Sequence, residues 1–145
     1  MRPRTLRVLL VQDSTGHSTG YHVVARGLRD AGHEVILGGA LLPREIARLA
    51  GEEGVDAIGY RIMDASPALL VERLAGALAR AGLDDVPVVV GGIVPDEDRA
   101  RLAALGVAGV FGPGATLASI AEFFAALGRR PLLGEARPPA PAGAP

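Results

Sequence analysis

Residues 6–37 read LRVLLVQDSTGHSTGYHVVARGLRDAGHEVIL, and the order of residue types in this stretch indicates the fold. It opens with an apolar run, continues through a polar loop that contains glycine, and closes with a second apolar run. Between the loop and the second run, Val24, Leu28 and Ala31 recur at the spacing of one helical face. Neither run alternates apolar with polar residues, which is typical of strands buried on both faces. The stretch therefore predicts two parallel strands joined by a helix.

The same alternation continues to the end of the domain. Five apolar runs predict strands: Leu6–Val11, Glu34–Leu37, Ala57–Tyr60, Val86–Val90 and Gly109–Phe111. Gly32, Gly82 and Gly106 stand where the intervening helices would end, and Pro43 and Pro95 stand where helices would begin. Five such units with right-handed crossovers predict a doubly wound, flavodoxin-like α/β fold, whose parallel sheet has the order 2-1-3-4-5. Five units are too few to close an eight-stranded barrel.

Length and composition narrow the class of protein. The 145 residues fit one domain, which we expect to span residues 1–130, because the proline-rich segment 131–145 has no apolar period and is expected to be a disordered tail. A formal charge of −1 argues against a nucleic-acid binder, and the lack of cysteine excludes disulfides and thiolate metal sites. No apolar run reaches the roughly 18–20 residues of a membrane span or forms a secretion signal. A cytoplasmic protein is therefore expected.

Ligands of this fold bind outside the carboxyl ends of the strands, near the point where the strand order reverses. The loops at that edge are residues 12–20, 61–66, 91–98 and 112–116, and three of them contain at least two glycines. Glycine lets a ligand approach the backbone closely, although turns between strands and helices also use glycine for their own geometry. The candidate site is thus a set of loops at one edge of the sheet.

His17 is the histidine of the first of these loops, and it lies beyond the strand end, where a ligand can reach it. A neutral imidazole can bind a metal through one nitrogen while an acceptor holds the other. The alternative is a histidine that merely caps the loop. His22 could line the same edge, whereas His33 follows a helix end and is expected at the surface. The spacing of the three predicts no zinc site made of protein ligands alone.

Three segments are similar to a known family. The segment GHSTG at 16–20, with the residues that follow it to Gly32, resembles the cobalamin-binding domain of methylmalonyl-CoA mutase and related acyl-CoA mutases. VGGIVPDED at 90–98 is similar to that family's glycine pair and the helix start after it. FGPG at 111–114 looks like its last loop. The similarity covers about residues 5–128.

The resemblance implies a cofactor, a set of residues and a partner. It places His17 as the histidine of the family's D-x-H-x-x-G motif, the lower axial ligand of cobalt in adenosylcobalamin, with Gly20 as the closing glycine. It implies that the displaced nucleotide tail lies in a slot between the first and third strands, where Gly91 and Gly92 make room. It further implies that a separate large subunit binds the acyl-CoA substrate, so this chain would be a small subunit, inactive alone and without a catalytic residue. The other residues expected at the cofactor are Thr15, Gly16, Ser18, Arg61, Met63, Gly112 and Gly114.

Two positions depart from the family pattern. Thr15 stands where the family has the aspartate that orients the imidazole, and Asp13 would replace that carboxylate only if the loop folds back. Arg61 stands where the family has a small serine that touches the tail, so it either fills the slot or pairs with an anion such as a phosphate. These departures support a second hypothesis, a divergent module that binds no cobalamin and acts through a protein partner.

Two further classes share this fold. Residues 14–19 resemble the hydroxyl-rich phosphate loop of flavodoxins, and a helix N-terminus favours anions, but only Tyr21 and Tyr60 could stack on a flavin. A response-regulator receiver is less well supported. The third strand ends in Tyr60-Arg61 without a phosphate-accepting residue, and the lysine expected on the fifth strand is missing.

Overall fold

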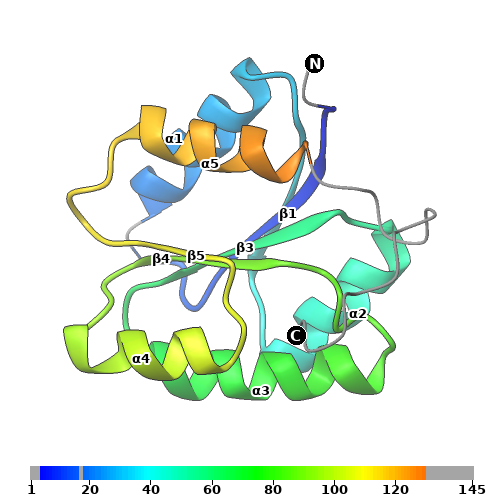
Figure 1. The fold of residues 1–145 in the computed structure, drawn as a ribbon, viewed down its shortest axis with the longest axis vertical. Coiled ribbons are helices and arrows are strands. Elements are labelled where there is room, and N and C mark those ends of the chain that lie inside the picture. The colour runs from blue at the N-terminus through cyan, green and yellow to red at the C-terminus, as the bar shows by residue number, and fades with distance from the viewer. Residues whose placement is uncertain (1–3, 17, 130–145) are drawn as a thin grey trace, which may run out of the picture.

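A computed structural model describes residues 4–16 and 18–129, which form a parallel five-stranded sheet between two layers of helices (Figure 1). The strand order β2-β1-β3-β4-β5 confirms the predicted flavodoxin-like topology. The elements are β1 (Arg7–Gln12), α1 (Ser18–Asp30), β2 (Glu34–Ala40), α2 (Pro43–Glu53), β3 (Ala57–Ile62), α3 (Pro67–Arg80), β4 (Val88–Gly92), α4 (Asp96–Ala104), β5 (Gly109–Phe111) and α5 (Leu117–Leu127). The proposed tail, 131–145, lies outside the described residues.

Several strands extend further toward their carboxyl ends than the apolar runs indicate. β3 continues to Ile62 through Arg61, and β4 includes Gly91 and Gly92, because ladder hydrogen bonds between backbones do not require apolar side chains. β4 starts at Val88 rather than Val86, and the intervening Pro87 has no N–H to donate to the ladder. These extensions bring Arg61 and the glycine pair into the sheet itself.

Each face of the sheet has its own apolar core, because successive side chains of a strand point to opposite faces. In β1, Leu9 and Val11 pack into the cluster that α2, α3 and α4 cover, whereas Val8 and Leu10 pack into the cluster under α1 and α5. Figure 1 shows these two helical layers on opposite sides of the strands. All four side chains are at most 5% exposed. The α1 and α5 layer is the one that bears on function.

The predicted helix ends agree with the structure to within one residue. Gly32, Gly82 and Gly106 follow helices with φ of +97°, +73° and +86°, the positive values for which glycine is favoured at these ends. α2 begins at Pro43 as predicted, and α4 begins one residue after Pro95. The prediction that Ala31 belongs to the buried face of the first helix is wrong, because α1 ends at Asp30 and Ala31 is exposed.

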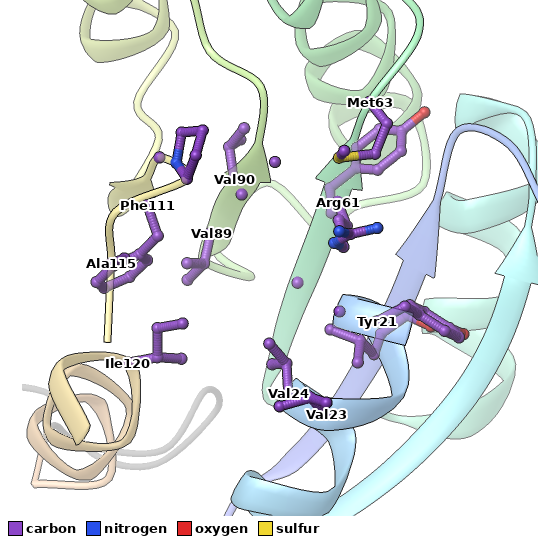
Figure 2. A pocket seen from close by; sticks show the side chains of 18 of the residues that line it. Tyr21, Val23, Val24, Arg61, Met63, Val89, Val90, Phe111, Ala115 and Ile120 are labelled. Atoms are coloured by element: carbon purple, nitrogen blue, oxygen red, sulfur yellow. The ribbon is translucent and has the colours of Figure 1, made fainter. Parts of the chain in front are cut away.

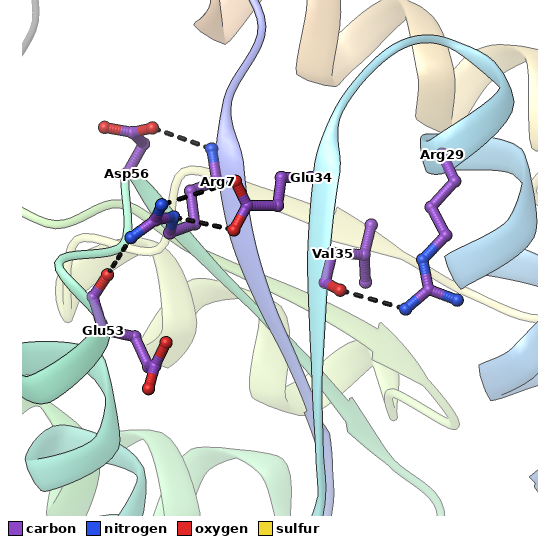
Figure 3. Close-up of polar contacts among 6 residues, drawn as sticks. All are labelled: Arg7, Arg29, Glu34, Val35, Glu53 and Asp56. Atoms are coloured by element: carbon purple, nitrogen blue, oxygen red, sulfur yellow. Dashed lines mark hydrogen bonds and ion pairs between the residues drawn. The ribbon is translucent and has the colours of Figure 1, made fainter.

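Polar contacts tie together the strands at the amino edge of the sheet (Figure 3). The Arg7 backbone N–H donates to Asp56 Oδ2 at 2.8 Å, and its guanidinium donates to the Glu53 carbonyl at 2.7 Å. The same guanidinium pairs with Glu34 at 3.0 Å. On the next helix Arg29 donates to the Val35 carbonyl at 3.0 Å. These groups are engaged in holding strands and helices together, at the edge opposite the candidate loops.

His33 is buried, with 7% of its surface exposed, so its predicted surface position is wrong. Its Nδ1 accepts a hydrogen bond from the Leu6 N–H at 3.0 Å, and its ring lies against Phe124 with centroids 6.5 Å apart. The histidine joins the end of α1 to the start of β1, a long-range contact that local patterning does not reveal. Burial lowers the pKa of His33 from its ordinary value of 6.5.

No helix within residues 4–16 and 18–129 is both long enough and apolar enough to cross a membrane.

Candidate cofactor cleft

A cleft of about 500 Å³ opens at the carboxyl edge of the sheet, between α1 and α5. Figure 2 shows its two walls: Val23 and Val24 on α1 face Ile120 on α5, across a floor made by the strands. This volume is within the usual range for small-molecule sites. The slot expected between β1 and β3 is thus a wider cleft that extends over β4 and β5.

The pairing register explains the shape of the floor. Arg61 of β3 lies opposite Gly91 of β4, which lies opposite Phe111 of β5, so these three positions share the face under α1 and α5. A Cβ atom added to Gly91 would meet its nearest atom, the Phe111 carbonyl oxygen, at an ordinary 3.6 Å. The missing side chain of Gly91 therefore leaves open space in the cleft.

Gly92 has a different role from its neighbour. Its φ is +102°, and a Cβ atom there would lie 2.2 Å from the Ile62 carbonyl oxygen. A side chain at this position would collide with the backbone of β3 and would also be conformationally strained. Gly92 thus serves the close approach of two strand ends, while Gly91 serves the volume of the cleft.

Arg61 is the charged side chain at the mouth of an otherwise uncharged cleft lining. It is half-buried, and it extends from β3 toward the start of α1 (Figure 2). A Cβ atom on Gly20 would lie 2.5 Å from Arg61 Nη2, so the absence of a side chain on α1 makes room for the guanidinium. Arg61 therefore borders the cleft without filling its 500 Å³.

Asp13, the second residue of the first loop, holds the loop after β3. Its carboxylate accepts hydrogen bonds from the backbone N–H groups of Met63, Asp64 and Ala65 at 2.9, 2.8 and 2.8 Å. Burial acts to raise the pKa of Asp13, but these hydrogen bonds outweigh it and hold the pKa below 3.8. The Asp13 carboxylate is therefore engaged with the loop that follows β3.

Two polar atoms at the end of β1 are buried without a hydrogen-bond partner in the described part of the chain. They are the Oε1 of Gln12, a residue only 4% exposed, and the Oγ of Ser14. Gln12 pairs in register with Arg61, so it lies beside the cleft mouth on the same face of the sheet. Buried polar groups are normally satisfied, so each of these two atoms costs free energy in the folded chain as described.

The structure brings together part of the predicted residue set. Gly20, Arg61, Met63, Gly91, Gly92 and Gly112 line the cleft. Thr15, Gly16 and Gly114 are exposed and do not line it, and Ser18 is the half-buried first residue of α1. His17 lies outside the described residues.

Sequence reasoning missed the walls of the cleft. Val24 and Ile120 belong to apolar helical faces, and such periodicity by itself predicts core packing. The structure instead leaves both partly exposed toward the space between α1 and α5. The glycines of the strands beneath these helices were a sequence signal for a cleft, because residues without side chains leave the space between the helices and the sheet unfilled.

The tyrosines considered for flavin stacking are not available for it. Tyr21 and Tyr60 are 3% and 1% exposed. The Tyr21 hydroxyl donates to the Leu10 carbonyl at 2.8 Å and accepts from the Gly39 N–H at 2.9 Å. Burial, with a smaller contribution from Asp13, raises the pKa of Tyr60 to about 12. Among the described residues, no group of three or more histidine, aspartate or glutamate side chains could hold a metal ion.

Comparison with solved structures defines the class of fold. A chemotaxis protein CheY4 of Vibrio cholerae matches with a TM-score of 0.64 and 19% identity, over 86% of this chain and 99% of that one. A DNA-binding response regulator of the LuxR family from Staphylococcus aureus matches with a TM-score of 0.67 and 10% identity, over 86% and 99% of the two chains. At these identities the likeness shows the doubly wound α/β fold alone.

Sequence comparison defines the family. Residues 7–121 match the B12 binding domain, and the chain belongs to that family. The pivalyl-CoA mutase small subunit of Xanthobacter autotrophicus is 46% identical over 130 residues, which are 88% of this chain and 86% of that protein. The 2-hydroxyisobutanoyl-CoA mutase small subunit of Aquincola tertiaricarbonis is 37% identical, over 86% of this chain and 96% of that protein.

Longer relatives carry the same domain as one part of a larger chain. Methylmalonyl-CoA mutase of Escherichia coli is 40% identical over 114 residues, which are 78% of this chain and 16% of that enzyme. The predicted resemblance to the acyl-CoA mutase family is therefore confirmed.

Proposed function

We propose that this chain is the cobalamin-binding small subunit of an adenosylcobalamin-dependent acyl-CoA mutase. The observation that carries the proposal is the apolar cleft under α1 and α5, whose floor is open at Gly91, in a chain of the B12 binding family. Two relatives of similar length are named as mutase small subunits, which supports the assignment as a subunit.

The residues present fit the nucleotide tail of cobalamin. That tail ends in a flat aromatic base, which suits a cleft walled by valine and isoleucine side chains and floored by glycine. The base is joined to the corrin through a ribose and a phosphodiester, and the anionic phosphodiester suits a mouth where Arg61 lies. Apolar depth and polar mouth thus match the order of groups along the tail.

Within this proposal each part of the chain has a defined task. His17 would hold the cobalt through its imidazole, and Thr15, Gly16, Ser18 and Gly114 would contribute to the loops that receive the cofactor. The walls of α1 and α5 enclose the tail and exclude water. When bound, the cofactor supplies a homolytically cleavable cobalt–carbon bond for radical chemistry, and the protein supplies binding and orientation.

The proposed partner is a mutase large subunit that binds the acyl-CoA substrate. This chain spans only 16% of the length of the Escherichia coli mutase, so most of such an enzyme would be supplied separately. We expect this chain alone to bind cofactor without turning over substrate. Affinity purification of this chain from its native source tests the proposed partner. Recovery of the chain without a mutase large subunit would contradict the proposal.

Cofactor binding is tested by absorbance titration of the purified protein with hydroxocobalamin and adenosylcobalamin. We expect the base-off spectrum of a corrinoid whose lower ligand is a protein imidazole. The His17→Ala variant should lose this signature. His22→Ala is the matched control, because His22 is an exposed histidine on the adjoining helix. An unchanged spectrum in His17→Ala, or no binding by the wild type, would refute the proposal.

One observation favours the divergent module as a second candidate. Arg61 lies at the cleft mouth and extends to Gly20, where it narrows the entrance. If the chain were such a module, Arg61 should fill the slot, whereas the cleft remains open with a volume of about 500 Å³. It would gain support if the wild type bound no corrinoid and Arg61→Ser restored binding.

A further inference from the structure

We propose that Arg61 is a specificity-determining residue that binds the phosphodiester of the cofactor's nucleotide tail. This inference rests on the proposed function and adds to it a role for a residue at which this chain departs from the family pattern.

The position of Arg61 is set by the sheet rather than by a loop. It lies in β3, between Gln12 of β1 and Gly91 of β4 in the pairing register. Its side chain extends over the face that α1 covers, as far as Gly20. Arg61 is thus a half-buried residue whose backbone is fixed in the sheet and whose guanidinium lies where Gly20 on the facing helix leaves room for it.

Arg61 is the one charged side chain among the described residues that line the cleft. None of the residues that line the cleft is acidic within the described chain. Asp13 donates its backbone N–H to the Arg61 carbonyl at 3.1 Å, but its carboxylate is engaged with the N–H groups of Met63, Asp64 and Ala65. α1 also begins at Ser18, beside the same mouth, and a helix N-terminus carries partial positive charge.

The ligand group that fits is a phosphodiester. It is the one anionic group of the cobalamin tail, and a guanidinium presents two parallel N–H donors that match phosphate oxygens. The apolar walls lower the local dielectric, which strengthens such a contact relative to one in water. The base beyond the phosphodiester would then enter the apolar depth over Gly91.

The test compares corrinoids that differ only in the tail. Cobalamin has the complete tail, cobinamide phosphate retains a phosphate without the base, and cobinamide has neither. Dissociation constants are measured by absorbance titration for the wild type, Arg61→Gln, Arg61→Ser and Arg61→Lys. Arg26→Gln is the matched control, because Arg26 is an exposed arginine on α1.

We expect Arg61→Gln and Arg61→Ser to bind cobalamin and cobinamide phosphate roughly 10- to 100-fold more weakly, which is the range for a charge-assisted hydrogen bond. Arg61→Lys should lose less affinity for these two corrinoids, because lysine keeps the positive charge but lacks the planar guanidinium with its two parallel donors. Cobinamide affinity should be unchanged in every variant. Raising the salt concentration should weaken cobalamin binding more in the wild type than in Arg61→Gln.

Each contrary result has a distinct meaning. Tighter cobalamin binding by Arg61→Ser would show that Arg61 obstructs the cleft, and would overturn the inference while leaving the proposed function standing. Equal losses for cobalamin and cobinamide would show a merely structural role. If the wild type bound none of the three corrinoids, the proposed function would fail, and the inference with it.

Discussion

Substitution of the two adjacent glycines at the end of β4 should have different effects: a change at Gly92 should lower stability, and a change at Gly91 should weaken cofactor binding. Gly92→Ala places a Cβ atom 2.2 Å from the Ile62 carbonyl oxygen and requires φ near +102° in a residue that rarely adopts it. Backbone strain of this kind costs roughly 1–3 kcal/mol, and the required shift of β3 adds to it. We therefore expect a loss of about 3 kcal/mol in the free energy of unfolding, or roughly 6–12 °C in Tm.

Gly91→Val should leave folding nearly unchanged and weaken cofactor binding instead. The new Cβ atom meets the Phe111 carbonyl oxygen at 3.6 Å, which is ordinary contact, and valine suits a strand. Its methyl groups would enter the cleft under α1 and α5, where forcing extra carbon atoms against a ligand costs about 1–3 kcal/mol. This corresponds to roughly tenfold to hundredfold weaker binding of cobalamin.

The assay pairs thermal unfolding, followed by circular dichroism, with absorbance titration of hydroxocobalamin. Gly91→Ala serves as an intermediate step, because it adds one carbon atom at the same position. If Gly91→Val melted as early as Gly92→Ala, the assignment of Gly91 to the open cleft would be wrong. Cobalamin affinity equal to that of the wild type in Gly91→Val would show that the tail does not pass over this glycine.

Three further predictions concern the polar residues His33, Asp13 and Gln12. Burial lowers the pKa of His33, so the unfolded chain binds a proton at this residue more readily than the folded chain does. The free energy of unfolding should therefore fall as pH drops through about 6.5, which urea unfolding between pH 5 and 8 would measure. The His33→Gln variant should show a weaker dependence on pH. Asp13→Asn should destabilise the protein by about 1–3 kcal/mol, because the amide cannot accept all three backbone hydrogen bonds. In the wild type the pKa of Asp13 in the folded chain lies below 3.8, so its contribution to stability should disappear as pH falls through and below that value. Gln12→Met should raise the Tm of the cofactor-free protein by a few degrees, equivalent to about 1 kcal/mol, because Gln12 Oε1 is buried without a partner in the described chain; a lower Tm would show that the amide is satisfied in solution.

The candidate site was only partly predictable. The loops at the carboxyl edge follow from the order of apolar runs, and Gly20, Arg61 and Gly91 do line the cleft. The walls at Val24 and Ile120 were not identified as cleft residues, because apolar residues at helical spacing read the same whether they face a core or a cavity. The role proposed for His17 remains a prediction, since that residue lies outside the described chain.

The sequence by itself determined the architecture, because apolar periodicity, helix-ending glycines and run lengths are local properties that survive without knowledge of any contact. Only the tertiary structure decided what individual polar residues and glycines do. Asp13 holds N–H groups some fifty positions away, as its bond to Met63 shows, and His33 is buried by a bond to Leu6. Gly91 and Gly92 are the same residue type, so the sequence does not distinguish them. Strand register and backbone φ place Gly91 in the cleft and Gly92 at the close approach of two strands.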